Sequence, residues 1–114
     1  MVMKIAIPLA DGVLASHFGH CERFALLEVE LEQRKMLARN DIVAPPHEPG
    51  LLPRWLAEHG ADMIIAGGMG ERARELFSQS GIKVFTGAPP VDPEQLVHHF
   101  MHGSLSLGAN QCEH

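Results

Sequence analysis

The sequence has few cysteines. Only Cys21 and Cys112 occur among 114 residues, which is too few for the disulfide framework of a small secreted domain. A chain of this length that is 46% hydrophobic buries a sufficient core without a disulfide or a structural metal. We therefore expect residues 1–103 to form one α/β domain, followed by a flexible tail over residues 104–114, and the two thiols to be metal ligands, reactive groups or inert core residues.

Basic charge is also scarce, and long apolar runs are missing. Lys and Arg number 9 against 14 Asp and Glu, the formal net charge is -5, and the basic residues never cluster, so the footprint of a nucleic-acid-binding protein is absent. No apolar run approaches the ~20 residues of a membrane span, and the sequence begins with a strand-like pattern rather than a signal peptide. We expect a cytoplasmic protein with neither nucleic acid nor membrane as a partner.

Signals of catalysis are weak. Cys21 with His17 or His20 is a conceivable nucleophile and base, but neighbouring loop residues rarely reach the required geometry, and no third orienting group is evident. Alternating carboxylates at Glu28 and Glu30 are most simply the solvated face of a hairpin. We therefore do not expect an enzyme.

The chain does contain a regular series of strand and helix patterns. Strands are predicted over Met3–Pro8, Arg23–Glu30, Met36–Val43, Ala61–Ala66 and Ile82–Phe85, and helices from Pro53 to His59, from the glycine run at 67–70 to Gly81, and onward from the N-cap at Asp92. The second and third strands follow each other as an antiparallel hairpin, whereas the later strand–helix–strand order requires parallel pairing. The prediction is a mixed sheet of about five strands with packed helices.

The first candidate site is the stretch Ser16-His17-Phe18-Gly19-His20-Cys21. Its two imidazoles and one thiol are borderline-soft metal ligands, although their spacing matches no standard zinc motif. A closed tetrahedral site would need further ligands, and the candidates elsewhere in the sequence are His47, Cys112 and His114. The alternative is that the histidines are structural and the cysteine is unreactive.

The second candidate site is the run Gly67-Gly68-Met69-Gly70 between a predicted strand and a predicted helix. Backbone N–H groups at a helix N-terminus carry partial positive charge and can hold an anion, and glycine permits close approach. The spacing matches neither the dinucleotide fingerprint nor the P-loop. The alternative is a tight turn that needs left-handed backbone angles.

Taken in order, four segments resemble the dinitrogenase iron-molybdenum cofactor biosynthesis family, which includes NifX, NafY, the C-terminal domain of NifB and the orange protein that carries a molybdenum-copper sulfide cluster. The segments are Met3–Pro8, Ser16–Phe24, Ala61–Gly70 and Gly81–Gly87. The resemblance covers about Met3 to Phe100.

This resemblance implies an α/β fold with a ribonuclease-H-like motif, namely a five-stranded mixed sheet with helices on both faces. It also implies binding and carriage of an anionic metal-sulfur cluster or its precursor, of the iron-molybdenum cofactor or molybdenum-copper sulfide type, as in nitrogen fixation. Carried over by position, the cofactor-binding residues are Ser16, His17, Phe18 and Gly19 together with Gly67, Gly68, Met69 and Gly70. Cys21 and Met69 offer soft sulfur contacts.

Other functions remain open at this point. The chain is alternatively a divalent-metal or small-anion binding module, with His17, His20, Cys21, His47, Cys112 and His114 as the metal-ligand candidates, or a regulatory interaction protein whose site is vacant. Expected partners are the cluster itself and cofactor-biosynthesis proteins or an apo-target enzyme. A monomer or a weak dimer fits a hairpin edge that carries charge.

Overall fold

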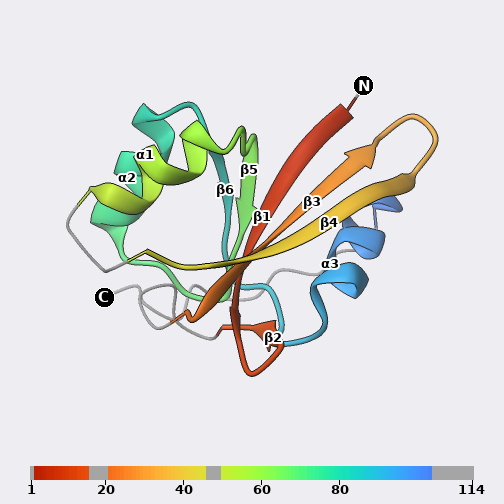
Figure 1. Ribbon diagram of the computed structural model, residues 1–114, viewed down its shortest axis with the longest axis horizontal. Coiled ribbons are helices and arrows are strands. Elements are labelled where there is room, and N and C mark those ends of the chain that lie inside the picture. The colour runs from red at the N-terminus through yellow and green to blue at the C-terminus, as the bar shows by residue number, and fades with distance from the viewer. Residues whose placement is uncertain (1, 16–20, 46–49, 104–114) are drawn as a thin grey trace.

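The computed structural model describes residues 2–15, 21–45 and 50–103, and they form a mixed α/β fold (Figure 1). The elements in chain order are β1 (Val2–Ala10), β2 (Val13–Leu14), β3 (Arg23–Glu30), β4 (Lys35–Val43), α1 (Leu51–Glu58), β5 (Met63–Ile65), α2 (Glu71–Gln79), β6 (Lys83–Phe85) and α3 (Pro93–Met101). The predicted order of five strands and three helices is confirmed. The predicted tail, residues 104–114, lies outside the described residues.

The sheet has six strands rather than the predicted five. Its order is β4-β3-β1-β5-β6, and β2 pairs with β1 beside this path. β1 is antiparallel to β3 and parallel to β5, which is parallel to β6. The prediction missed β2 because two residues, Val13 and Leu14, are too few to show a periodic pattern.

Pro8 lies inside β1 and does not end the strand as predicted. It is buried and pairs with Phe24 of β3. On the other side of β1, the pairing with β5 is at Ile5 and Ala6, and the pairing with β2 begins at Leu9. The missing N–H of the proline therefore falls where β1 changes partners, so no ladder hydrogen bond is lost.

The β3–β4 hairpin is present, and β3 has the predicted bounds. The turn lacks an Asn-Gly pair, but Arg34 adopts a left-handed φ of +54°. A bulge at Glu28 and Val29 shifts the register so that Leu37 has no opposite residue, and Leu37 is 54% exposed. The bulge returns the inward-facing positions of β4 to the correct faces of the sheet.

Helices cover both faces of the sheet, as predicted. α1 and α2 bury Leu52, Leu56 and Phe77 in one core cluster, and α3 buries Leu96 and Val97 in the other. Figure 1 shows the first pair on one side of the sheet and α3 on the opposite side. No helix among the described residues is long and apolar enough to cross a membrane.

α1 begins at Leu51, and Pro53 lies in its first turn, as predicted. Gly50 precedes the helix with a left-handed φ of +78°, a conformation that glycine adopts without a steric cost. Pro53 then occupies the third helical position, where a backbone N–H would have no partner within the helix. The proline therefore marks the first turn rather than the first residue.

Candidate functional site

The glycine turn, residues 67–70, leads from the carboxyl end of β5 into α2. Gly67 and Gly68 are buried, whereas Gly70 is exposed and extended, with no side-chain cap on the helix. The first helical hydrogen bond runs from Arg74 N–H to Gly70 O at 3.1 Å. The N–H groups of residues 71–73 therefore have no acceptor within the helix, and they give this end partial positive charge.

A loop that follows β6 fixes the glycine turn. Gly87 N–H donates to Gly67 O at 2.8 Å, and Ala88 N–H donates to Ala66 O at 3.2 Å. Gly87 adopts a φ of +84°, which is the left-handed region where glycine is preferred. No structural role was predicted for this loop, although a glycine two residues after a strand is a signal for a turn.

Ala15 and Glu22, on either side of residues 16–20 in the sequence, are both bonded to the carboxyl end of β1. Ala15 N–H donates to Pro8 O at 2.9 Å, and Glu22 N–H donates to the next carbonyl, Leu9 O, at 2.7 Å. The Glu22 side chain also accepts from Asp11 N–H at 3.1 Å. Since β1 and β5 are parallel neighbours, Ala15, Glu22 and the glycine turn all lie at the same edge of the sheet.

Most of the predicted site residues lie outside the described residues. Those residues are Ser16, His17, Phe18, Gly19, His20, His47, Cys112 and His114. The structure places Cys21 of the first candidate stretch and all of the second stretch, Gly67 to Gly70. The metal and cofactor roles of the other residues stay predictions.

Cys21 and Met69 are both core residues. Cys21 is 7% exposed and Met69 is fully buried, and both belong to the core cluster on the α1/α2 face. Burial raises the pKa of the Cys21 thiol to about 11, so the thiol is protonated at neutral pH. The role of Cys21 as a metal ligand stays a prediction. Ala15 belongs to the same core cluster as Cys21 and Met69.

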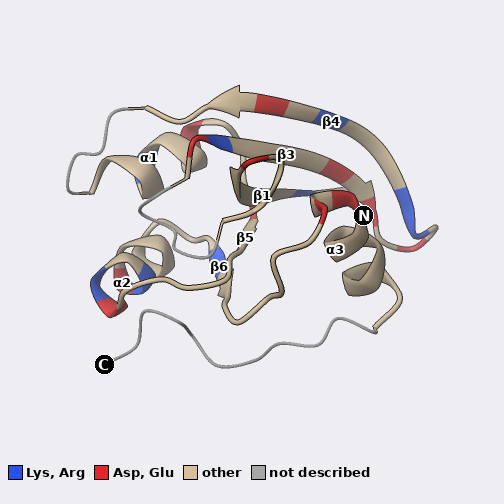
Figure 2. Ribbon diagram, turned by 90° about the horizontal axis from the view of Figure 1, so that it is seen from below, with Lys and Arg blue, Asp and Glu red and all other residues tan. Residues whose placement is uncertain are grey.

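Two hollows among the described residues are each lined by charges of both signs. One of about 230 Å³ is lined by Leu9, Asp11, Gly12, Glu22, Arg23 and Asp41. The other, of about 540 Å³, lies between α2 and β6, and its charged residues are Glu71, Arg74, Glu75 and Lys83. Figure 2 shows both signs of charge interspersed on α2. The described residues do not contain a group of three His, Cys, Asp or Glu that could hold a metal ion.

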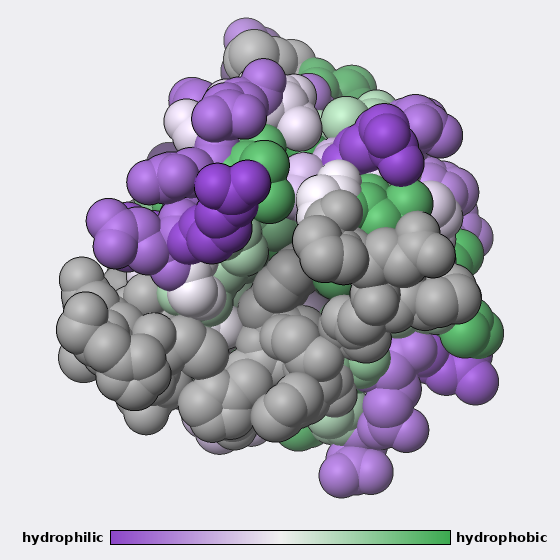
Figure 3. Space-filling model, turned by 90° about the vertical axis from the view of Figure 1, so that its left-hand side faces the viewer, coloured by the Kyte–Doolittle hydropathy of each residue, from purple (hydrophilic) through white to green (hydrophobic). Residues whose placement is uncertain are grey.

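On the side of the molecule that carries α1 and α2, the surface formed by the described residues is partly hydrophilic and partly apolar. Figure 3 shows hydrophilic residues interrupted by small apolar patches. An anion at this edge must therefore be held by local donors rather than by a broad field.

Residues 1–103 match the family model described as dinitrogenase iron-molybdenum cofactor. The chain belongs to this family. A curated relative, an uncharacterised protein of Methanocaldococcus jannaschii called MJ0580, is 32% identical over 107 residues, which cover 91% of this chain and 90% of the relative. Membership in the iron-molybdenum cofactor family indicates a role in cofactor biosynthesis or binding.

Solved structures of similar fold agree with this assignment. The crystal structure of PH0822 has a TM-score of 0.84 with 30% identity, and the similarity covers 92% of this chain and 94% of that one. The apo form of the orange protein from Desulfovibrio gigas has a TM-score of 0.71 with 24% identity, covering 95% and 94% of the two chains. At that identity the orange protein is evidence for the fold alone.

Proposed function

We propose that the chain binds and carries an anionic metal-sulfur cluster, or a precursor of one, during cofactor biosynthesis. One observation supports this most strongly. Ala15 and Glu22, on either side of residues 16–20 in the sequence, are bonded to Pro8 and Leu9 of β1, next to the strand that leads into the glycine turn. A ligand at this end of the sheet would meet the backbone donors at the start of α2, and His17 and His20 are the side-chain donors that the sequence predicts.

Local donors have to supply the attraction for such a cluster. The net charge of -5 opposes an anion at long range, so binding depends on short contacts. The start of α2 offers three backbone N–H groups that have no acceptor within the helix, and imidazoles offer further N–H groups. Hydrogen bonds from these donors to a sulfide are strengthened by its negative charge. Glu71, exposed in the first turn of α2, weakens this attraction.

The proposal requires no turnover. The cluster is cargo. Carriage would take place in the cytoplasm, between cofactor-biosynthesis proteins and an apo-target enzyme. The experiment below also determines which metals the cluster contains, namely iron, molybdenum or copper.

The test is an anaerobic titration of the purified protein with tetrathiomolybdate, with and without Cu(I), and with an iron-sulfur cofactor precursor. Absorption spectra and elemental analysis after desalting measure what is retained. We expect stoichiometric retention of at least one of these clusters. In the His17→Ala variant, retention should fall to a small fraction of that value while the circular dichroism spectrum stays unchanged.

A matched histidine variant controls for unspecific effects. His99 is exposed on α3, which lies on the face of the sheet opposite α2, so His99→Ala should retain the cluster as the wild type does. No retention of any cluster by the wild type, with divalent metal bound instead, would replace the carrier by a metal-binding module. Equal retention by the His17→Ala variant would remove that residue from the site.

A further inference from the structure

Two histidines lie one turn apart at the end of α3. The backbone N–H of His102 donates to His98 O at 3.1 Å, so the helical path is continuous between them. Both side chains are exposed, and their ring centres are 4.3 Å apart with the ring planes inclined by 44°. The His99 ring is farther away, 5.8 Å from that of His98.

This ring spacing fits two imidazoles bound to one metal ion. With metal–nitrogen bonds of about 2.1 Å and a right angle at the metal, the two ring centres would be roughly 4.5 Å apart. Histidines at positions i and i+4 of a helix are a known arrangement for a shared ion because both project from one face. Side-chain rotation alone brings both rings onto a common ion.

We propose that His98 and His102 chelate one divalent transition-metal ion of the class that prefers imidazole, namely Zn²⁺, Ni²⁺ or Cu²⁺. Water completes the coordination. Because only two protein ligands are present, the ion exchanges readily with solvent, unlike one in a closed structural site.

The charges near the pair come from the hairpin turn and from the chain as a whole. Arg34 of the hairpin turn repels a cation locally, whereas the net charge of -5 attracts one overall.

The histidine pair is remote from the glycine turn. β1 begins opposite the end of β3, where Val2 pairs with Glu30, and the last turn of α3 lies near that hairpin end (Figure 1). The glycine turn lies at the opposite end of the sheet, where the parallel strands β1 and β5 end. The proposed metal site is therefore independent of the proposed cluster site.

The test is a titration of the whole chain with Ni²⁺ by calorimetry, paired with amide NMR spectra in the presence of substoichiometric Cu²⁺. We expect a binding event of one ion per chain that weakens at least ten-fold in both His98→Asn and His102→Asn. Paramagnetic broadening should centre on residues 95–103. The affinity should fall as the pH is lowered, because protons compete with the metal for the imidazole nitrogens.

His99→Asn is the matched control, since it removes an adjacent exposed histidine and keeps the i, i+4 pair. Its affinity should equal that of the wild type. Broadening confined to residues outside α3 would overturn the proposal, as would equal Ni²⁺ affinity in the His98→Asn variant. Loss of binding in His99→Asn with retention in His98→Asn would also overturn it.

Discussion

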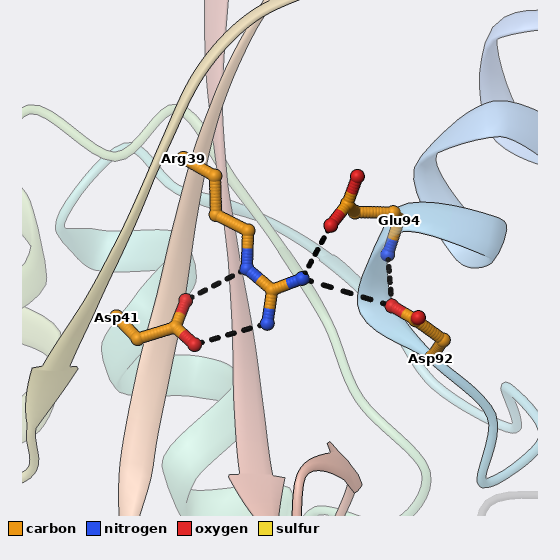
Figure 4. Close-up of polar contacts among 4 residues, drawn as sticks. All are labelled: Arg39, Asp41, Asp92 and Glu94. Carbon is orange, nitrogen blue, oxygen red and sulfur yellow. Dashed lines mark hydrogen bonds and ion pairs between the residues drawn. The ribbon is translucent and has the colours of Figure 1, made fainter.

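Arg39 joins β4 to the start of α3, and its removal should measurably destabilise the protein. Its guanidinium contacts both oxygens of Asp41, from Nε at 2.8 Å and from Nη2 at 2.9 Å, and its Nη1 donates to Glu94 at 2.7 Å. Asp92, the N-cap of α3, lies 3.7 Å from the same Nη1. Figure 4 shows the guanidinium between the carboxylates of the two elements.

The expected magnitude follows from the exposure of the partners. Arg39 is 26% exposed, but Asp41 and Glu94 are 35% and 54% exposed, so solvent screens each pair. An exposed ion pair contributes up to about 1 kcal/mol, and removing the cation also leaves carboxylates facing one another without neutralisation. For Arg39→Met we expect a loss of about 1–2 kcal/mol in unfolding free energy, or roughly 5–10 °C in Tm for a domain of this size.

The pH dependence gives a second readout. The Arg39 guanidinium lowers the pKa of Asp41 below its ordinary value of 3.8, so the folded state binds this proton less tightly than the unfolded state. The contribution is therefore fully present above about pH 4 and is lost as the pH falls through the folded pKa. The difference between wild type and Arg39→Met should shrink over that acidic range.

Thermal and urea unfolding at pH 7 are the assays. Arg39→Lys should recover only part of the loss, because an ammonium cannot make the two-pronged contact with Asp41. Arg54→Met is a matched control, since Arg54 is exposed on α1 and makes no ion pair among the described residues. A Tm for Arg39→Met within 1 °C of wild type, as an order-of-magnitude limit, would refute this reasoning.

Three other substitutions give independent tests. In the Cys112→Ser variant, Cys21 should react with iodoacetamide at pH 8 at least about 100-fold more slowly than a free thiol, because little thiolate exists at a pKa of about 11. Denaturant should remove this protection. Fast reaction of the folded protein would contradict the burial of Cys21. Asp92→Ala should cost about 1 kcal/mol in urea unfolding, because Asp92 accepts from Glu94 N–H at 2.9 Å, and an unchanged midpoint would show that the cap is not needed. Glu71→Gln should tighten retention of an anionic cluster by about two- to five-fold in a desalting assay, because it removes a negative charge from the first turn of α2, and unchanged or weaker retention would place the cluster elsewhere.

The sequence predicts the elements of this fold well where a periodic pattern or a cap is local. The hairpin strand over Arg23–Glu30 has the predicted bounds, and Asp92 caps α3 as its neighbours suggest. The prediction fails where a partner distant in sequence decides the conformation. β1 continues through Pro8 because its neighbour changes there, and β2 exists only because it pairs with the end of β1.

The candidate site was predictable in its composition but not in its geometry. The glycine turn stands out by its residues, and its place after a central strand is confirmed. The bonds from Gly87 and Ala88 that hold it depend on the parallel pairing of β5 and β6, which no local pattern encodes. The burial of Cys21 likewise depends on a core cluster whose members are distant in sequence, such as Leu56 and Phe77, so no local pattern predicts it.

The measurement that tests the central proposal most directly is an anaerobic map of amide shifts on addition of tetrathiomolybdate with Cu(I). The account predicts that the largest perturbations fall on residues 67–73 and on Ala15, Cys21 and Glu22, with residues 95–103 of α3 unchanged. Perturbations centred on α3 or on the groove between α2 and β6, with the glycine turn unaffected, would contradict a cluster site at the carboxyl ends of β1 and β5.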